Sequence, residues 1–391
     1  MSQPLKGIKI LDFTTLLPGP YATQLLADMG AEVVRVESPT RPDLLKLLPP
    51  MVGKVSASHA SVNRNKKTIA VDLKHESAKE IVHKLVSEFD IVIEQFRPGV
   101  MARLGLDYEA LVKFQSKLIY CSITGYGQTG PLKDRAGHDI NYLALSGLAS
   151  FSGRKETGPT LSATQVADIA GGSHHAVMAI LAAVIERAST GKGQHLDISM
   201  SDAALALSTM FGANALVSGK DPACGEEMLN GGLFYDYYQT ADGKYISVGS
   251  LEPNFAMVLL STLGLTAYQN KIADQRAETQ TEIKAAIAAK VIEKDQAHWN
   301  DVFGNLDACV EPVLSINQAA AHPHFIARGM ITTAVDETGN EIQQINSALP
   351  FKSEGIKQAG RPLGADTSDV LKSLGYSDEQ VQGLREGKCV K

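Results

Sequence analysis

Short apolar runs alternate with segments of helical spacing through the N-terminal third of the chain. Residues 7–13 form an apolar run of strand length, residues 21–29 repeat apolar side chains at helical spacing, and residues 32–37 form a second apolar run. Gly30 stands where the helix would end. The pattern predicts a strand–helix–strand unit with two parallel strands across residues 7–37.

The same alternation recurs farther along. Strands are predicted at residues 68–73, 90–94 and 118–123, and a helix is predicted at residues 77–89. This order favours an open, Rossmann-like α/β domain with a parallel sheet. The first strand-to-helix loop carries Pro-Gly-Pro in place of GxGxxG, and prolines lack the amide donors that hold a pyrophosphate. We therefore do not expect a nicotinamide dinucleotide site.

Longer helices and a hairpin are predicted in the second half of the chain. Residues 163–189 are rich in small apolar side chains at helical spacing, residues 195–199 are strand-like, and residues 201–216 are apolar and helical. Residues 217–232 are polar and glycine-rich, which is typical of a linker. Residues 233–249 contain two strand-like runs around an Ala-Asp-Gly turn, which predicts a β-hairpin.

Composition and charge narrow the class of protein. Of the 391 residues, 44% are hydrophobic and 20% are charged, which is typical of a globular protein too long for one simple core. The net charge of −6 offers no basic surface for nucleic acid. The four cysteines lie far apart and form no CxxC pair, so we expect neither a zinc site nor a disulfide framework. This cysteine usage fits a reducing, cytoplasmic location.

Two stretches bear on export and membranes. The N-terminal segment MSQPLKGIKILDF has no basic stretch followed by an apolar run, so no signal peptide is expected. The apolar run at residues 179–185 is ended by Glu186 and Arg187, and it is too short to span a bilayer. We interpret this run as a buried helix and expect no membrane association.

Three polar residues are candidates for chemistry. His138 follows a predicted strand and turn, near the carboxyl end of a parallel strand where ligands bind in open α/β sheets. Taken alone, a helix-start histidine bonded to a loop is the favoured alternative. Asp168 has small apolar neighbours that would raise the pKa of its carboxyl and make it a usable base, although a helix cap is the commoner role. Glu252 precedes Pro253, and by itself a helix entry is its simplest interpretation.

Two pairs of neighbouring histidines offer no metal site. His174 and His175 are adjacent, so their side chains point to different faces of a helix. His322 and His324 flank a proline without nearby acids, and we interpret them as loop residues.

Several cations lie near predicted loop or strand ends, namely Lys74, Arg97, Arg103 and the cluster at residues 64–67. Guanidinium and ammonium groups in such places suit a phosphate-bearing ligand. The alternative is a solvated charged face, which is the usual role of a lysine cluster.

Nine stretches along nearly the whole chain carry a resemblance: LKGIKILDFTTLLPGPYATQLLADMGAEVVRVE, VDLK, VIEQFRPGVMARLGLDY, SITGYGQTGP, AGHDINYLALSG, ADIAGG, GKGQHLDISMSD, YYQTADGKYISVGSLEPNF and PLGADTSDVLKSLGYS. Taken together and in this order, they resemble the class III CoA-transferase superfamily, also called the CaiB/BaiF family, and within it the racemases of α-methylacyl-CoA thioesters.

Ser38 departs from that branch, which commonly carries a basic residue at this position. Arg35 or Arg41 is expected to replace it at the CoA nucleotide.

The resemblance implies roles for individual residues. His138 and Asp168 match the two acid/base groups of the racemases, and Glu252 matches a partner that orients and charges the histidine. The CoA moiety is implied to bind along the following residues: Val71, Asp72, Leu73, Lys74, Arg97, Arg103, Gly137, Asp139, Ile140, Asn141 and Tyr142.

The resemblance also implies an interlocked homodimer, with each active site between the large domain of one subunit and the small domain of the other. Glu252 would then reach the site from the neighbouring chain. The tail is predicted to end in a helix capped by Asp366 or Thr367. The expected domains are a large α/β domain at residues 1–200 joined by a returning segment at 345–391, a linker helix and loop at 201–232, a small α+β domain at 233–330, and a second linker at 331–344.

The implied activity is interconversion of (R)- and (S)-2-methylacyl-CoA through an enolate, with His138 on the S side and Asp168 on the R side. No metal, flavin or nicotinamide is implied, because coenzyme A is part of the substrate. The alternative is a CoA-transferase, in which the aspartate matching Asp168 forms a mixed anhydride and then a thioester. Transferases usually carry tyrosine where His138 stands, which favours the racemase. A third alternative is a CoA-binding scaffold without activity.

Overall fold

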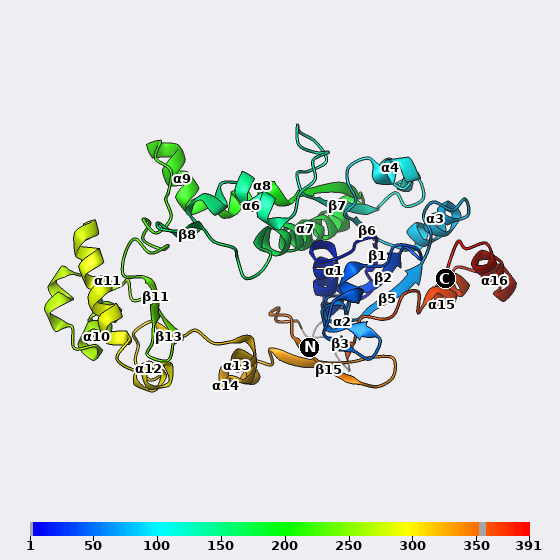
Figure 1. Ribbon diagram of the computed structural model, residues 1–391. Coiled ribbons are helices and arrows are strands. Elements are labelled where there is room, and N and C mark those ends of the chain that lie inside the picture. Colours follow the sequence, from blue (N-terminus) through cyan, green and yellow to red (C-terminus); the bar gives the residue numbers. More distant parts are fainter. Residues whose placement is uncertain (1–2, 352–356) are drawn as a thin grey trace. The chain divides into compact units, whose positions relative to one another are not determined.

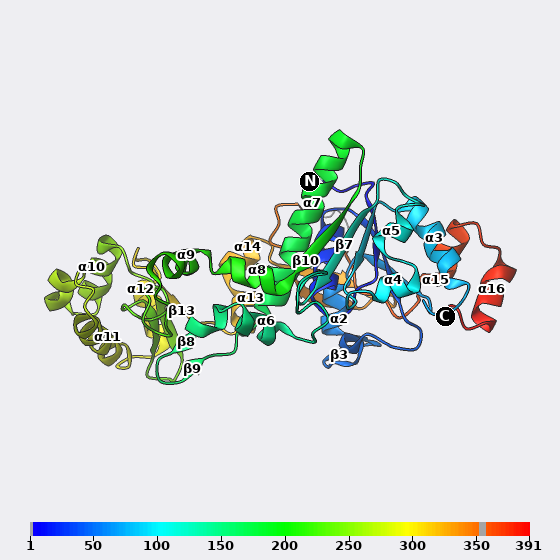
Figure 2. The ribbon, with the colours of Figure 1, turned by 90° about the horizontal axis from the view of Figure 1, so that it is seen from above.

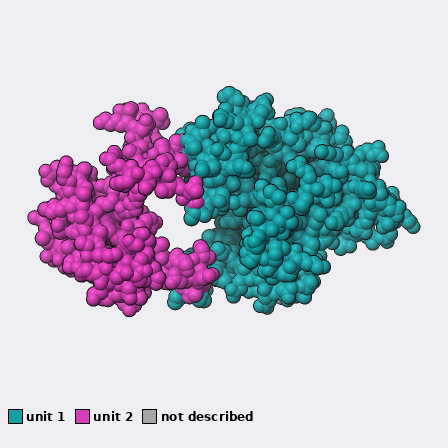
Figure 3. Space-filling view, viewed as in Figure 1, with its two compact units in different colours: residues 1–146, 163–207, 323–391 teal, residues 147–162, 208–322 magenta. Residues whose placement is uncertain are grey.

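The computed structural model describes residues 3–351 and 357–391 (Figure 1). The chain divides into two compact units, coloured separately in Figure 3. Unit 1 comprises residues 1–146, 163–207 and 323–391, and unit 2 comprises residues 147–162 and 208–322.

A six-stranded, all-parallel sheet forms the centre of unit 1, which agrees with the predicted α/β class. Its strand order is β10-β7-β6-β1-β2-β5, so the chain first builds outward from β1 and then returns to the other side of β1 with β6. The strands are β1 (Lys9–Asp12), β2 (Glu32–Glu37), β5 (Lys66–Ala70), β6 (Ile91–Glu94), β7 (Ile119–Thr124) and β10 (Gln194–Ser199).

Helices cover both faces of this sheet, as Figure 2 shows. Successive strand residues alternate between the two cores because side chains in a strand point to opposite faces. Ile10 belongs to the core under α1 (Pro18–Asp28) and α7 (His175–Thr190), whereas Leu11 belongs to the core under α3 (Ala78–Glu88). Both side chains are fully buried, and such burial contributes about 1.5–3 kcal/mol for each.

The helical run predicted at residues 163–189 begins at Ala167 in the structure, and its first two turns are not α-helical. Its first element, η3 (Ala167–His174), is a π-helix that continues into α7. A Cβ atom on Gly172 would lie 3.1 Å from Met200 Cγ and 3.2 Å from Pro18 Cβ, so the missing side chain lets neighbouring elements pack closely. The run 167–190 is long and apolar enough to cross a membrane; its Ala176 and Ile180 are buried in the core of unit 1, whereas Ile185 is exposed.

The C-terminal segment packs against the edge of the sheet. Helix α15 (Thr367–Ser373) has Asp366 at the predicted N-cap position, but the Asp366 side chain makes no hydrogen bond to the first turn of the helix. The Asp366 carboxylate instead accepts a hydrogen bond from the Thr68 backbone N–H of β5 (2.8 Å). Val390 forms an isolated β-bridge with Val71. The last helix, α16 (Asp378–Glu386), begins with a capping box at Ser377.

Unit 2 is built on the predicted hairpin. Strands β11 (Asp236–Gln239) and β12 (Tyr245–Val248) are antiparallel, and β13 (Val310–Pro312) pairs with β12. Three helices pack on this sheet around a core that includes Trp299, namely α10 (Pro253–Thr262), α11 (Ala277–Val291) and α12 (Gln296–Phe303).

Residues 331–344, expected to be a linker, lie mostly in a second hairpin of β14 (Ile331–Val335) and β15 (Glu341–Ile345). Its apolar face is narrow, with Ala334 and Ile342 buried, so the sequence pattern there is mostly polar.

The remaining elements are η1 (Leu44–Leu47), β3 (Met51–Val52), β4 (Val55–Ser56), α2 (Ala57–Val62), α4 (Val100–Leu104), α5 (Tyr108–Leu111), α6 (Asp139–Leu145), η2 (Leu148–Phe151), β8 (Gly153–Arg154), β9 (Gly158–Pro159), α8 (Met200–Leu207), α9 (Thr209–Ser218), η4 (Thr266–Lys271), α13 (Ile316–Ala321), α14 (Pro323–Ala327) and β16 (Lys357–Gln358).

The Asp366 cap gives a stability prediction. We expect Asp366→Ala to lower the free energy of unfolding by about 1–3 kcal/mol, because the buried Thr68 N–H loses its acceptor. Urea denaturation measures the change. Exposed Asp369 in the first turn of the same helix is the control, and equal losses in Asp369→Ala and Asp366→Ala would contradict this role.

Candidate active site

A cavity of about 460 Å³ opens in unit 1 where the strand order reverses. Its walls include Leu16 and Pro18 after β1, Gln95 after β6, and Gly125 after β7. Loops on either side of such a reversal run in opposite directions from the sheet, which leaves a crevice at the carboxyl ends of the strands. The topology therefore places this cavity where α/β proteins bind ligands.

His138 lines this cavity as the N-cap of α6. Its backbone is extended, and Asn141 Oδ1 accepts a hydrogen bond from the His138 N–H (3.0 Å). The side chain of His138 is exposed to solvent. A side chain one turn into the helix thus fixes the backbone that carries the imidazole.

Asp168 lines the same cavity from the first turn of η3. The pKa of its carboxyl is raised to about 6, mainly by burial and then by the negative charge of Asp139, while His138 acts in the opposite direction. The direction agrees with the desolvation predicted from its small apolar neighbours. The fold therefore brings the imidazole and the carboxyl group, 30 positions apart in sequence, to one cavity.

Tyr142 lines the cavity together with these two residues. Its hydroxyl donates a hydrogen bond to the Gly137 carbonyl (2.6 Å), and its ring meets that of Tyr126 edge-on. A Cβ atom on Gly137 or Gly125 would lie within 2.7 Å of the Tyr142 ring, so both glycines are needed for this close approach. Burial, followed by the charge of Asp168, raises the pKa of Tyr142 to about 12.

Gln95 joins two walls of the cavity, and the sequence pattern did not single it out. Its Oε1 accepts a hydrogen bond from the Gly19 N–H (3.1 Å), and its Nε2 donates to the Thr15 carbonyl (2.7 Å). The amide side chain thereby fastens the loop after β6 to the loop after β1. The sequence around a glutamine after a strand does not indicate these contacts, because the two partners lie 76 and 80 residues earlier along the chain.

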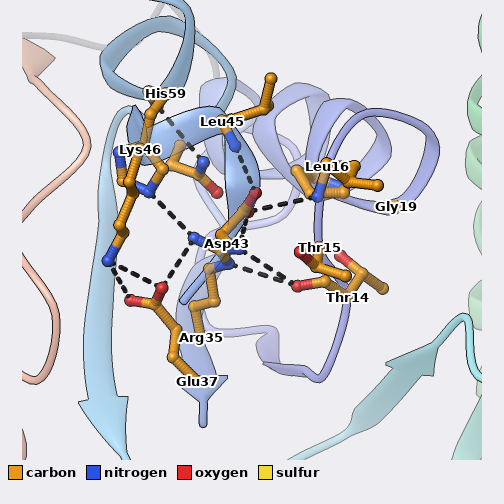
Figure 4. Close-up of polar contacts among 12 residues, drawn as sticks. Thr14, Thr15, Leu16, Gly19, Arg35, Glu37, Asp43, Leu45, Lys46 and His59 are labelled. Atoms are coloured by element: carbon orange, nitrogen blue, oxygen red, sulfur yellow. Dashed lines mark hydrogen bonds and ion pairs between the residues drawn. The ribbon is translucent and has the colours of Figure 1, made fainter. Parts of the chain in front are cut away.

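A buried charge cluster supports the loop after β1, as Figure 4 shows. Asp43 pairs with Arg35 and accepts a hydrogen bond from the Leu16 N–H (3.2 Å). Arg35 also donates to the Thr14 carbonyl (3.3 Å). Leu16 has a φ of 61°, in the region that side chains rarely adopt. The cluster thus holds a strained residue in the cavity wall.

The same cluster corrects one expectation from the sequence. The Arg35 side chain is 2% exposed and is bound to Asp43 and Glu37, so it is not available to replace the missing basic residue at Ser38. Arg41 is exposed, and its backbone N–H donates to Ser38 Oγ (3.1 Å).

Within the described part of the chain, three cationic side chains line the cavity. One of them was predicted from the sequence to bind the ligand, and the other two were not. Arg97 lines the cavity, and so do Lys133 and Arg135 from the loop before His138. The expected cluster at residues 64–67 is largely internal instead. Arg64 is 1% exposed and pairs with Asp28.

The other residues expected to bind CoA are divided between the cavity and other parts of unit 1. Among the described residues, the cavity walls include Gly137, Asn141 and Tyr142, but not Arg103 or Ile140, which are exposed, nor Asp139. The segment 71–74 is likewise outside these walls. Val71 is 1% exposed, the Asp72 N–H donates to the Cys389 carbonyl, and Leu73 packs against the core, which leaves Lys74 as the exposed residue of the four.

Glu252 belongs to unit 2, where it is the exposed N-cap of α10 before Pro253. A hollow of about 480 Å³ in this unit is lined by Tyr235, Gly249 and Cys309. Burial, followed by the charge of Glu252, raises the pKa of the Cys309 thiol.

The adjacent histidines make structural contacts. His175 Nδ1 lies 2.7 Å from the Ala170 carbonyl, and the His174 ring packs beside Tyr21. No cluster of three or more histidine, cysteine, aspartate or glutamate side chains that could hold a metal is present in residues 3–351 and 357–391.

The raised pKa of Asp168 gives a prediction that does not depend on activity. Its pKa is about 6 in the folded chain, above the ordinary aspartate value, so ionisation destabilises the fold as pH rises from about 4 to 6. We expect Asp168→Asn to raise the free energy of unfolding at pH 7.5, on the order of 1 kcal/mol after allowance for partial exposure, and the gain to vanish below pH 4. Denaturation at several pH values measures it, with exposed Asp134→Asn as control, and a gain independent of pH would contradict the assignment.

Known proteins resemble this chain along almost its whole length. Residues 5–367 match CoA-transferase family III. The α-methylacyl-CoA racemase of Homo sapiens is 34% identical over 99% of this chain and 97% of its own. The succinyl-CoA:glutarate CoA-transferase of Homo sapiens is 32% identical over 98% of this chain and 89% of its own.

A solved structure shows the same fold. The CaiB/BaiF family protein from Brucella suis superimposes with a TM-score of 0.83 at 29% identity, and the match covers 96% of this chain and 100% of that one. Together with the sequence matches, this likeness shows that the chain belongs to CoA-transferase family III, the CaiB/BaiF family.

Proposed function

We propose that this protein is an α-methylacyl-CoA racemase, which interconverts (R)- and (S)-2-methylacyl-CoA by proton transfer through an enolate. One observation supports the proposal above the others. An imidazole and a carboxyl group of raised pKa, His138 and Asp168, line the same cavity at the switch point of the sheet.

The chemistry requires a base and an acid on opposite faces of one carbon atom. The α-proton of a thioester is far less acidic than any side chain, so its removal needs a positioned base and stabilisation of the enolate oxygen. A carboxylate with a pKa of about 6 is a stronger base than an ordinary aspartate and is still largely ionised at neutral pH. In our proposal His138 acts on the S side and Asp168 on the R side, and amides of the loop before His138 or of the start of η3 stabilise the oxygen.

The proposed substrate fits the charge of the cavity wall. Arg97, Lys133 and Arg135 present three cations to a ligand whose nucleotide part is rich in phosphate. The acid and base are side chains, so the proposed reaction requires no metal or redox cofactor, and coenzyme A enters as part of the substrate.

A homodimer would complete this site. We propose that Glu252 reaches His138 from a second copy of the chain, as the family resemblance implies. Helix α9 supports association, because its adjacent Leu216 and Val217 are 90% and 91% exposed. Apolar side chains exposed in this way mark interaction surfaces when they form a patch.

A CoA-transferase is the second candidate function. The relatives include the human succinyl-CoA:glutarate CoA-transferase, which is nearly as similar to this chain as the human racemase. In a transferase the Asp168 carboxylate would attack the thioester carbonyl, release CoA thiolate and form a mixed anhydride. In that reaction the C–H bond at the α-carbon stays intact, so His138 would transfer no proton there.

Isotope exchange distinguishes the two functions. We expect (R)- and (S)-2-methylacyl-CoA in deuterated water to interconvert and to gain one deuterium at C2, without any second carboxylic acid. His138→Ala is expected to lower racemisation by about 10²–10⁴-fold but to retain exchange of the (R)-thioester, and Asp168→Ala to retain exchange of the (S)-thioester. Mass spectrometry and chiral chromatography measure both outcomes. CoA exchange between two free acids, without deuterium uptake, would instead support the transferase.

The proposed dimer has its own test. We expect sedimentation of the full chain to give twice the monomer mass, and Leu216→Asp to shift it toward monomer with a parallel loss of activity, because the charge would be buried at the interface. Exposed Lys220 just beyond the same helix serves as the control, as Lys220→Glu. An active wild-type monomer would contradict a site shared between two copies.

A further inference from the structure

Asp139 is next to one candidate acid/base residue in the chain and is hydrogen-bonded to the backbone of the other. It directly follows His138 in the chain and is the first residue of α6. Its Oδ1 accepts a hydrogen bond from the Asp168 backbone N–H (3.0 Å). The walls of the cavity include His138 and Asp168, whereas Asp139 is not one of the residues that line it. Its carboxylate is thus bound to the backbone that carries one candidate group, and its own backbone adjoins the other.

The backbone of Asp168 is held by side chains on both sides. Its N–H belongs to the first turn of η3, where backbone donors have no partner within the helix, and Asp139 supplies the acceptor. A negative charge at this end of a helix is also favourable. The single hydroxyl proton of Ser173 is shared between the Pro18 carbonyl (2.6 Å) and the Asp168 carbonyl (3.2 Å).

The charge of Asp139 acts on Asp168 as well. Burial is the largest cause of the raised pKa of Asp168, the negative charge of Asp139 is the next, and His138 acts in the opposite direction. The titratable groups that act on Asp168 therefore come from α6 and its N-cap. Tyr142 belongs to the same helix, and the charge of Asp168 raises the pKa of its hydroxyl. Arg97, after β6, acts on Tyr142.

We propose that Asp139 is a positioning residue of the proposed racemisation: its carboxylate, bound to the Asp168 N–H, sets the distance and orientation of Asp168 relative to His138. This inference rests on the proposed function. It gives the Asp139 side chain a role other than the CoA contact expected from the family resemblance.

Asp139 neither gains nor loses a proton in this scheme. On the R side the C2–H bond breaks, its proton passes to a carboxylate oxygen of Asp168, and the electron pair moves into the enolate. The imidazolium of His138 then donates a proton to the opposite face of C2, and the steps reverse in the other direction. Asp139 matters because a general base must lie within hydrogen-bond reach of the proton that it removes.

Two substitutions separate the charge of Asp139 from its hydrogen bond. Asp139→Asn keeps an acceptor oxygen for the Asp168 N–H but removes the charge, so we expect the acidic limb of the pH profile of kcat/KM to move to lower pH and kcat to fall several-fold at constant KM. Asp139→Leu removes both, and we expect kcat to fall about 10²-fold, the scale that a small misplacement of a catalytic group produces. Asp134→Asn, an exposed carboxylate in the preceding loop, is expected to match the wild type.

A stability cycle tests the same coupling without any assay of turnover. Asp168→Asn is compared in the wild-type and Asp139→Asn backgrounds by denaturation at pH 7.5. We expect its stabilising effect to be smaller in the Asp139→Asn background, because part of the charge repulsion on Asp168 is already removed.

Two results would overturn the role of Asp139. One is an Asp139→Asn enzyme whose pH profile matches that of the wild type, together with additive effects in the stability cycle. The other is a rise in KM for the acyl-CoA with kcat unchanged, which would indicate a CoA contact instead. A failure of the proposed function is distinct, because the wild-type chain itself would then show no deuterium uptake at C2.

Discussion

The reversal of strand order between β1 and β6 is the constraint on which the candidate site depends. In a parallel sheet all carboxyl ends of the strands lie at one edge, and the loops there diverge where the order reverses. The loops after β1, β6 and β7 form walls of the cavity for that reason, and α6 and η3 contribute His138 and Asp168 to the same space. The chemistry thus follows from the order in which the chain builds its sheet.

Divergent loops need internal support, and buried polar groups provide it. Asp12, at the end of β1, accepts hydrogen bonds from Thr14 and Thr23 and pairs with buried Lys66. Gln95 fastens the loop after β6 to the loop after β1, and Asp43 holds Leu16 in its left-handed conformation. A buried charge costs several kcal/mol unless it is paired and hydrogen-bonded, so such networks favour one arrangement of the loops over alternatives.

Burial also gives the site its electrostatic character. Asp168 is partly removed from water and lies near a second carboxylate, and both effects disfavour its ionised form. The histidine across the same cavity limits the rise. The balance leaves the pKa of the carboxyl near 6, which suits proton transfer close to neutral pH. Two of the three effects on the pKa of Asp168 come from His138 and Asp139, which are adjacent at the start of α6. This turn therefore carries His138 and also affects the basicity of Asp168.

The amino-acid sequence by itself determined the class of fold, the strand–helix alternation of unit 1, the hairpin at β11 and β12, and the identity of His138 and Asp168 as candidates. These features are local, since the period of apolar residues and the chemistry of turns act over a few neighbours. Only the tertiary structure decided that Arg35 and Arg64 are buried, that Gln95 joins two loops, and that Asp139 holds the Asp168 amide. Arg64, Gln95 and Asp139 each contact a residue that is distant in sequence, and side-chain pairing over such distances is set by the packing of the fold and gives no periodic pattern in the sequence.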